Sequence, residues 1–527
     1  MELQKNSYYV RVDILLCVDS RRSSTSIFQT LYGKLFMEPD HPSPLATRRI
    51  AIDPITRVEG HGKITLLLDD NNHIVEARLH IVEFRGFEKF IQGRPYWEVP
   101  FFVQRLCGIC PVSHQLAAAK AVDQIVGVRQ LTPTATKLRR LLHFGQILQS
   151  HALHFFHLSS PDFLFGFGSD PLQRNIVGVL EQYPEIALKG VKLRKFGQQI
   201  IEAITGKRIH GTGTVPGGMN KPLTIPQRDA LLADIDNILQ WSQEALALNE
   251  QIHTAHPEHR DFGTLHSNYL SMTGSNGELE FYHGGLRARY ADGTGILDQF
   301  DYCDYQQILR EEVRPWSYMK FPYLTALGIE QGWYRVGPLA RINNCDMIST
   351  PLAEAARQRF KGFGQGGLVH DTLAYHWARM IELLHCTESI HALLHDADIT
   401  GMELMAEKGE RQPQGIGVIE APRGTLFHHY QINAEGLITK ANLIVSTTSN
   451  NQAMNESVRS VANQYLDGQE ITEALLNHLE VAVRAYDPCL SCATHALGKM
   501  PLQVTLQSSD GKVIHQLTKG VDGEIHR

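Results

Sequence analysis

The spacing of apolar residues divides this 527-residue chain into a strand-rich start, a long helical middle and a second strand-rich stretch. Between residues 49 and 82, β-branched and alternating segments flank the turn sequence Asp69-Asp70-Asn71-Asn72. This pattern predicts a small antiparallel sheet. In residues 136–156, apolar residues recur mostly at three- and four-residue steps after the start signals Thr132 and Pro133, which predicts a helix.

Helical spacing recurs through much of the chain, in residues 174–206, 226–252, 351–361, 370–395, 451–466 and 470–484. Residues 414–447 return to strand patterning, with a turn at Ala434-Glu435-Gly436. The sequence contains no internal repeat and no low-complexity tract. We therefore predict a mainly α protein of the α+β class, with a large helical core and short antiparallel sheets near both ends.

Composition narrows the possible partners. The chain is 43% hydrophobic and 20% charged, with a formal net charge of −6, so it has no basic field for binding nucleic acid. Every apolar run is well short of the roughly 20 residues of a transmembrane helix. The early apolar stretch of residues 12–18 is followed by Arg21 and Arg22 rather than by a cleavage site for a signal peptidase. We expect a cytoplasmic protein.

Four of the eight cysteines form two C-x-x-C pairs, Cys107 with Cys110 and Cys489 with Cys492. Two intervening residues allow both sulfurs of a pair to face one ion, and two pairs make a soft four-sulfur site. Zinc ribbons usually keep their pairs about 15–20 residues apart, whereas almost the whole chain separates these two. A Cys₄ zinc site remains an alternative on spacing alone, and a thioredoxin-like redox role is less favoured.

Five segments in order resemble the large, catalytic subunit of nickel–iron hydrogenases, and together they extend from about residue 49 to 495. They are residues 53–61 (DPITRVEGH), 84–88 (FRGFE), 105–114 (RLCGICPVSH), 420–424 (EAPRG) and 487–495 (DPCLSCATH). The sequences GRPYWE at residues 93–98 and CGICPVSH at residues 107–114 are similar to those of the soluble, NAD-linked bidirectional branch of the family.

The resemblance implies the large-subunit fold and reversible heterolytic cleavage of H2 at a nickel–iron centre. Cys107 and Cys489 would be terminal nickel ligands. Cys110 and Cys492 would bridge nickel to an iron that carries CO and cyanide. Glu59 matches the carboxylate that transfers the proton; its alternative is a surface glutamate in a turn.

Four further residues receive roles from the same resemblance. Arg423 would donate to cyanide beside the open coordination position, and Asp487 would hold the guanidinium. Thr447 would donate to the other cyanide, or its hydroxyl would satisfy nearby backbone. His114 would hydrogen-bond a bridging sulfur; its alternative is a histidine on a helix face. The alternative for Arg423 is an arginine that caps a turn.

A second cation site is also implied. Glu88, the backbone carbonyl near Leu443, and His495 match its ligands, and the ion would be Mg²⁺ or Fe²⁺. The plainer alternative for Glu88 is an ion pair with Arg85.

The resemblance further predicts how the chain is organised. Maturation would cut between His495 and Ala496 and remove residues 496–527 as a C-terminal pro-segment. Residues 47–495 would then form the catalytic domain. Residues 1–46 look unlike the rest, either as an atypical arm or as untranslated sequence before an alternative start at Met37.

Electrons would leave through a partner. The remaining cysteines are single, and no G-x-G-x-x-G follows a strand, so we expect no iron–sulfur cluster, flavin or NAD on this chain itself. The resemblance implies an iron–sulfur small subunit, diaphorase subunits that bind flavin and NAD, a maturation endopeptidase and nickel-insertion factors. The alternatives are another hydrogenase branch with a different acceptor, or a structural subunit, either zinc-bound or like the quinone-site subunit of respiratory complex I.

Overall fold

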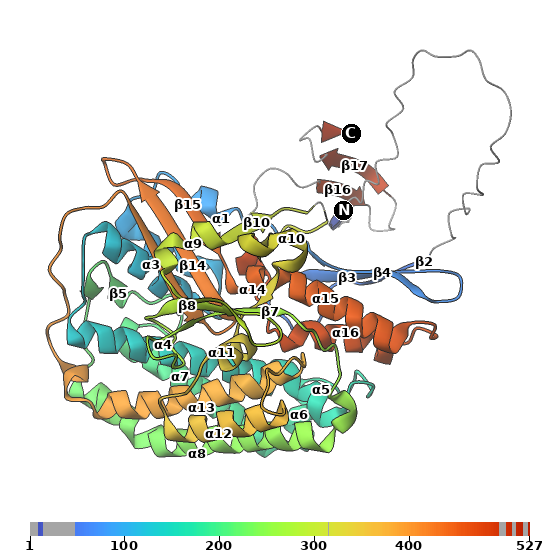
Figure 1. The fold of residues 1–527 in the computed structure, drawn as a ribbon, viewed down its shortest axis with the longest axis horizontal. Coiled ribbons are helices and arrows are strands. Elements are labelled where there is room, and N and C mark those ends of the chain that lie inside the picture. Colours follow the sequence, from blue (N-terminus) through green and yellow to red (C-terminus); the bar gives the residue numbers. More distant parts are fainter. Residues whose placement is uncertain are drawn as a thin grey trace, which may run out of the picture.

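A computed structural model gives the fold and is shown in Figure 1. It describes residues 9–13, 48–314, 316–494, 502–507, 513–519 and 525–526. The expectations for Met37, His495 and Ala496 therefore lie outside the described residues, as does most of the expected arm.

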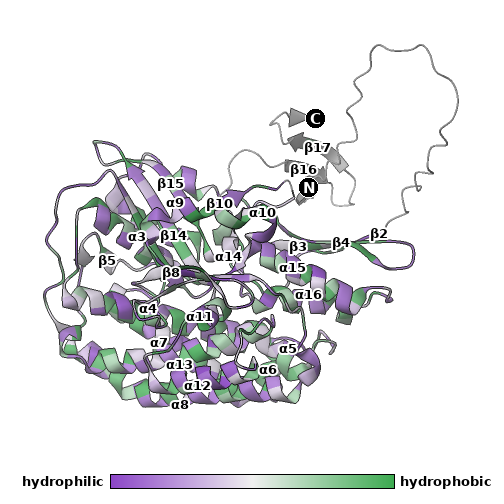
Figure 2. Cartoon of the chain, viewed as in Figure 1, coloured by the Kyte–Doolittle hydropathy of each residue, from purple (hydrophilic) through white to green (hydrophobic). Residues whose placement is uncertain are grey.

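Long helices form one side of the molecule in Figure 1. They are α4 (Pro133–Leu153), α7 (Pro184–Thr205), α8 (Ile225–Ala255), α12 (Pro351–Phe363) and α13 (Ala374–His395). The predicted start of α4 is confirmed, because the side chain of Thr132 accepts a hydrogen bond from the backbone N–H of Ala135 at 3.2 Å. Figure 2 shows hydrophilic and hydrophobic residues interleaved along α8 and α12, as expected for helices with one face towards solvent.

Two antiparallel three-stranded sheets match the predicted strand regions. The first contains β2 (Arg48–Ile52), β3 (Gly62–Leu68) and β4 (Ile74–Ile81). Asp69 shapes the turn between β3 and β4, because its Oδ1 accepts from the N–H groups of Asn71 and His73 at 2.8 and 2.9 Å. The second sheet contains β13 (Gln414–Ala421), β14 (Gly424–Ile432) and β15 (Ile438–Ile444).

The middle of the chain contains more strand than the periodicity predicts. A four-stranded sheet in the order β12-β7-β8-β9 forms from Asn268–Thr273 (β7), Gly285–Arg289 (β8), Gly295–Phe300 (β9) and Tyr334–Arg335 (β12). Next to it, β10 (Leu309–Glu312) pairs with β11 (Phe321–Leu324). These strands are short, and β7 is buried along its whole length, so neither a helical nor an alternating pattern marks them.

Helix α3 (Pro111–Ile125) packs directly on strand β13. Glycines in the strand make this approach possible: a Cβ on Gly417 would lie 2.0 Å from the carbonyl oxygen of Ala117, and one on Gly415 would lie 2.0 Å from that of Ala121. Fourteen of the fifteen α3 residues are buried. The first cysteine pair, immediately before α3, is thus fixed to the centre of the molecule.

The remaining helices near the chain's end complete the core. They are α15 (Asn451–Val461) and α16 (Glu473–Ala485), and the short α5 (Ser160–Phe165), which follows a π-helical turn at His154–Ser159, contacts α16. A further sheet pairs β1 (Tyr9–Asp13) with β16 (Leu502–Gln507), followed by β17 (Val513–Lys519) and β18 (Ile525–His526). The mainly α architecture with small antiparallel sheets confirms the predicted class.

Candidate metal centre

The first cysteine pair occupies the entry to α3. Cys107 follows a 3₁₀ turn at Val103–Leu106, and its Sγ accepts hydrogen bonds from the N–H groups of Ile109 and Cys110 at 3.3 and 3.2 Å. These backbone N–H groups fix the position of the sulfur at the entry to the helix. The sequence thus builds half of the site from local structure.

The second pair lies in irregular chain after α16. Asp487 has φ of 52° and begins a turn, and Cys492 lies in a single 3₁₀ turn at Ser491–Ala493. Tertiary contacts hold this segment in place: the N–H of Cys489 donates to Oγ1 of Thr447 at 3.0 Å, and the N–H of Leu490 donates to the carbonyl oxygen of Glu59 at 3.0 Å.

The structure brings all four sulfurs together. They lie within 4.8 Å of one another, the Sγ atoms of Cys107 and Cys489 are 3.1 Å apart, and all four side chains are buried. Hydrogen bonds from the other thiols lower the pKa of Cys110 well below its ordinary value, whereas burial raises the pKa of Cys489 and Cys492 well above theirs. Four buried sulfurs at this spacing can all be thiolates only when a cation balances their charge.

A small cavity lies against only two of the sulfurs. Its volume is about 10 Å³, and it is lined by Cys110, Cys492, His114, Arg423, Ser446 and Thr447 together with apolar side chains. Cys107 and Cys489 do not line it. The space thus adjoins one sulfur of each pair together with a cationic side chain, whereas a structural zinc ion is enclosed by its four ligands.

Arg423 and Asp487 lie together beside this cavity, as the motifs predicted. Arg423 follows β13, and its Nη2 donates to Oδ1 of Asp487 at 2.9 Å, while its Nε donates to the carbonyl oxygen of Asp487. Its Nη1 lies 3.4 Å from Oγ of Ser150. The guanidinium is thereby held on two sides and presents a fixed positive charge to the cavity.

Glu59 contacts the second pair directly. Its Oε2 accepts from Sγ of Cys489 at 3.0 Å and from the N–H of Ser491 at 3.2 Å, and its Oε1 accepts from the hydroxyl of Ser491. Gly60 permits this approach, because it has φ of +83° and a Cβ there would lie 2.6 Å from the backbone nitrogen of Ser491. A half-buried carboxylate on a sulfur is suited to accept and pass on a proton.

His114 and Thr447 also reach the site. His114 lies in the first turn of α3, lines the cavity next to Cys110, and pairs through Nδ1 with Nε2 of His428 at 3.1 Å. The oxygen of Thr447 accepts from the backbone of Cys489, as the structural alternative for this residue proposed, yet its side chain also lines the cavity.

The expected second cation site is described only in part. Burial raises the pKa of Glu88 to about 7, and its Oε1 accepts from the N–H of Leu443 at 2.8 Å. Lys320 lies 3.8 Å from the same oxygen. Arg85 donates instead to the carbonyl oxygens of Leu106 and Arg105, so the expected alternative of a Glu88–Arg85 pair is wrong.

Sequence reasoning missed several residues that support the site. Ser150 contacts Arg423, and Arg379 on α13 donates to the carbonyl oxygen of Ala485 at 2.9 Å, just before Asp487. Gln146 and Gln149 on α4 both donate to the carbonyl oxygen of Ile109, at 2.9 and 2.7 Å. Polar residues on otherwise buried helix faces are the signal that could have found them.

Two further observations concern other possible metal sites and membrane-spanning helices in the described residues. Within it, the other group of His, Cys, Asp or Glu side chains close enough to share an ion is His256, Glu258 and His259, just after α8. No helix in the described ranges is both long enough and apolar enough to cross a membrane.

Comparison with known protein families agrees with the geometry. The family described as nickel-dependent hydrogenase matches residues 85–165 and 264–495, and a family described as HoxL-like matches residues 49–84. The beta subunit of the NAD-reducing hydrogenase HoxS of Cupriavidus necator is 48% identical over 485 residues, covering 89% of this chain and 99% of the relative. One subunit of the F420-non-reducing hydrogenase of Methanothermobacter marburgensis is 39% identical over 477 residues, covering 89% of this chain and all of the relative.

Solved structures give the same picture. The chain is similar to a crystal structure of an NAD⁺-reducing [NiFe]-hydrogenase in the H2-reduced state, with a TM-score of 0.84 and 60% identity over 85% of this chain and all of that one. A Ni-Fe-Se hydrogenase from Desulfovibrio vulgaris Hildenborough has a TM-score of 0.69 at 23% identity over 85% of this chain and all of that one, and shows the same fold.

Proposed function

This chain belongs to the nickel-dependent hydrogenase family, and from that premise we propose that it is the catalytic subunit of an NAD(P)-linked nickel–iron hydrogenase. It cleaves H2 reversibly and heterolytically. Its electrons pass to NAD(P) through partner subunits. The acceptor rests on two similar proteins, which are named NAD-reducing and NAD⁺-reducing.

The observation that carries this proposal is the buried group of four sulfurs, with Arg423 and Thr447 lining the small space beside Cys110 and Cys492. Cys107 and Cys489 would hold the nickel as terminal ligands, and Cys110 and Cys492 would hold the nickel together with an iron that carries CO and cyanide. The donor set fits this group, because four soft sulfurs suit nickel and iron, and the space beside the bridging pair is lined by polar and apolar side chains. When bound, the group supplies the Lewis acid and redox centre that polarises H2.

The chain's own residues then handle the proton and the electrostatics. Glu59 takes the proton at its Oε2, which already lies 3.0 Å from Sγ of Cys489. Arg423, held by Asp487, supplies a fixed positive charge to the cavity beside Cys110 and Cys492. Thr447 and Arg423 would donate to the two cyanides, and His114 would hydrogen-bond the sulfur of Cys110, which it faces in the cavity.

A second cation, Mg²⁺ or Fe²⁺, would complete the C-terminal side of the centre. Its proposed ligands are Glu88, the backbone carbonyl of Leu443 and His495. Support comes from the closeness of Glu88 to the backbone of Leu443, and from the 3.2 Å hydrogen bond by which the N–H of Arg85 donates to the carbonyl oxygen of Thr494.

Maturation and assembly follow from the same family membership. We propose that residues 47–495 are the catalytic domain and that an endopeptidase cuts between His495 and Ala496 after nickel-insertion factors have loaded the site. The family match ends at residue 495, which supports this boundary. Residues 1–46 remain assigned as an atypical arm or as sequence before a start at Met37.

The electron path needs other chains. We propose diaphorase subunits with flavin and NAD, together with an iron–sulfur small subunit, in the cytoplasm. The similar proteins are themselves named as subunits of hydrogenases, which supports a multi-subunit enzyme.

The decisive experiment is elemental analysis of the complex purified from its native host, followed by an assay of H2-dependent NAD reduction. We expect about one nickel per chain together with iron. A Glu59→Gln variant should keep these metals and lose about 10²- to 10⁴-fold in rate, as expected for a missing acid–base group. Stoichiometric zinc without nickel in tail-cleaved protein would contradict the proposal and favour a structural role. Activity with another acceptor but not with NAD(P) would favour a different hydrogenase branch.

A further inference from the structure

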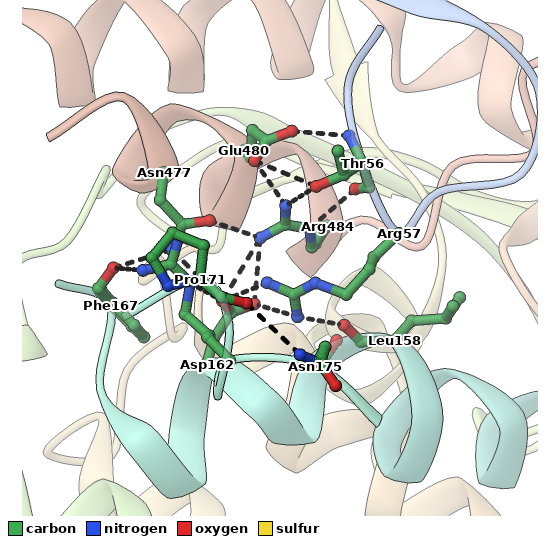
Figure 3. A network of polar contacts seen from close by, with 12 residues as sticks. Thr56, Arg57, Leu158, Asp162, Phe167, Pro171, Asn175, Asn477, Glu480 and Arg484 are labelled. Carbon is green, nitrogen blue, oxygen red and sulfur yellow. Dashed lines mark hydrogen bonds and ion pairs between the residues drawn. The ribbon is translucent and has the colours of Figure 1, made fainter. Parts of the chain in front are cut away.

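A buried cluster of charged residues joins three segments far apart in the sequence (Figure 3). They are the loop around Thr56 and Arg57, helix α5 with Asp162, and helix α16 with Glu480 and Arg484. The loop leads into Glu59, and α16 leads into Asp487 and Cys489. The cluster therefore lies behind both partners of the Glu59–Cys489 contact.

Asp162 is the point at which these segments meet. Its carboxylate accepts from Nη2 and Nη1 of Arg57 at 2.5 and 2.9 Å, and from Nη1 of Arg484 at 3.1 Å. Burial alone would raise its pKa, but the positive charges of Arg484 and Arg57 lower that pKa below its ordinary value. The side chain is only 2% exposed, so these ion pairs are shielded from solvent.

Arg484 and Glu480 then hold the loop from the other side. Nε and Nη2 of Arg484 donate to the carbonyl oxygen and Oγ1 of Thr56 at 3.0 and 2.8 Å. The N–H of Thr56 donates to Oε1 of Glu480 at 2.6 Å, and Glu480 accepts from Arg484 at 2.7 Å. Figure 3 shows both guanidinium groups directed towards Asp162, with Thr56 hydrogen-bonded to both Glu480 and Arg484.

Neither catalytic segment has regular structure of its own to fix it. Residues 53–58 lie outside any strand or helix, and both Arg57 and Asp487 have left-handed backbone angles, with φ of 55° and 52°. Glu59 meets Cys489 through one isolated backbone bridge. The separation between the Glu59 carboxylate and the Cys489 sulfur therefore depends on side-chain anchors.

We infer that Asp162 is a positioning residue for proton transfer: by binding Arg57 and Arg484 at one carboxylate, it sets the contact between Glu59 and Cys489. This inference rests on the proposed function. Asp162 touches neither the substrate nor the cysteines, and it acts through the two segments that carry Glu59 and Cys489.

The test uses the assembled enzyme carrying Asp162→Asn, which keeps the side-chain shape and removes the charge. We expect wild-type nickel and iron content, with kcat per nickel lower by about 10- to 100-fold, as for other residues that orient a metal site. The KM for H2 should stay unchanged and the solvent isotope effect on kcat should rise, because proton transfer becomes slower. The nickel EPR signal should change, because the hydrogen bond at Cys489 is altered.

A purely structural role predicts a different result. The variant would then yield less metallated protein, while kcat per nickel, isotope effect and EPR signal of the remaining molecules would equal wild type, and this result would overturn the inference. If Asp162→Asn does not fold, Arg57→Lys keeps the charge but cannot form two parallel bonds to the carboxylate. It should lower kcat per nickel and raise the isotope effect in the same way, and wild-type values would again overturn the inference.

The matched control is Glu473→Gln. Glu473 pairs with Arg174 at the edge of the same cluster, is half exposed, and has no hydrogen bond to Arg57 or Arg484 in the described structure. It should leave kcat, isotope effect and EPR signal unchanged. Absence of nickel and H2 activity in the wild-type complex would instead contradict the proposed function, so the two failures are distinguishable.

Discussion

Cys107 and Cys110 lie between a 3₁₀ turn and a fifteen-residue helix packed into the core, whereas Cys489 and Cys492 lie in irregular chain that follows α16. In the first pair, the sulfur of Cys107 is bound by backbone N–H groups of its own segment. In the second pair, the backbone of Cys489 is bound by Thr447, a residue far away in the sequence.

The side chains that hold the two cysteine segments in place also differ in charge. Neutral amides of Gln146 and Gln149 hold the first loop at the carbonyl oxygen of Ile109. The ion pair of Arg423 and Asp487, together with the carboxylate of Glu59, surrounds the second loop. Local structure thus builds the first half in advance, and long-range electrostatic contacts close the second half over it.

Substituting Cys110 or Cys492, the two proposed bridging cysteines, has the largest expected effect, and the effect should be equal for both halves of the centre. Cys110→Ser and Cys492→Ser should each lose nickel and iron and reduce H2-dependent acceptor reduction to background, because the centre needs all four soft ligands. Cys345→Ser is the control, since Cys345 is buried and lies outside the four-sulfur group. If either variant retained nickel and activity, the proposal that Cys110 and Cys492 have equal roles as metal ligands would be contradicted.

Substitutions of the residues that hold the two cysteine segments in place should affect activity to different extents. Arg423→Lys loses the fork that binds Asp487, and its activity per nickel should fall about 10- to 100-fold. Gln149→Leu removes one of two amides from the carbonyl oxygen of Ile109 while Gln146 remains, so its loss should be smaller. Steady-state assays normalised to nickel measure both. A larger loss in Gln149→Leu would reverse the proposed order of the halves.

Metal removal should loosen the second half more than the first. In metal-free chain, amides of residues 487–494 should exchange with solvent at least about tenfold faster than those of α3, a difference of about 1.4 kcal/mol in opening free energy. Hydrogen–deuterium exchange with mass spectrometry measures this, with α13 amides as the reference. Equal exchange of both segments would show that the tertiary contacts alone fix the second loop.

Acid should lower the free energy of unfolding of the helical part of the fold. The contribution of a single residue is the smallest of the effects expected here. Burial lowers the pKa of His151 to about 4, while the unfolded chain takes up its proton near about pH 6.5. Stability is therefore lost as pH falls from the unfolded value towards the folded one, by about 1 kcal/mol for this residue between about pH 7 and about pH 5.5.

His151→Gln tests this pH dependence. The glutamine cannot titrate and keeps a donor for Glu382, which pairs with His151 at 2.9 Å. Urea unfolding at both pH values should show a smaller acid-induced loss in the free energy of unfolding than in wild type. An identical loss would assign the acid sensitivity to other groups.

Much of the fold was predictable from local pattern. The start of α4 at Thr132 and the turn at Asp69 both follow from side chains that bond their neighbouring backbone, so a short segment contains the signal. The strands around β7 were not predicted, because a short strand that is buried on both faces shows no alternation. Its burial depends on helices and strands distant in the chain.

The metal-centre residues divide in the same way. The sequence by itself determined the four sulfurs, their pairing by two, and the motif residues Glu59, Arg423 and Asp487, since residue type and spacing are local properties. Only the tertiary structure decided that a cavity borders Cys110 and Cys492, and that Ser150, Arg379 and Asp162 contact Arg423, Ala485 and Arg57. The cavity and these three contacts form between segments that are far apart in the chain. They therefore exist only after those segments have packed into one core.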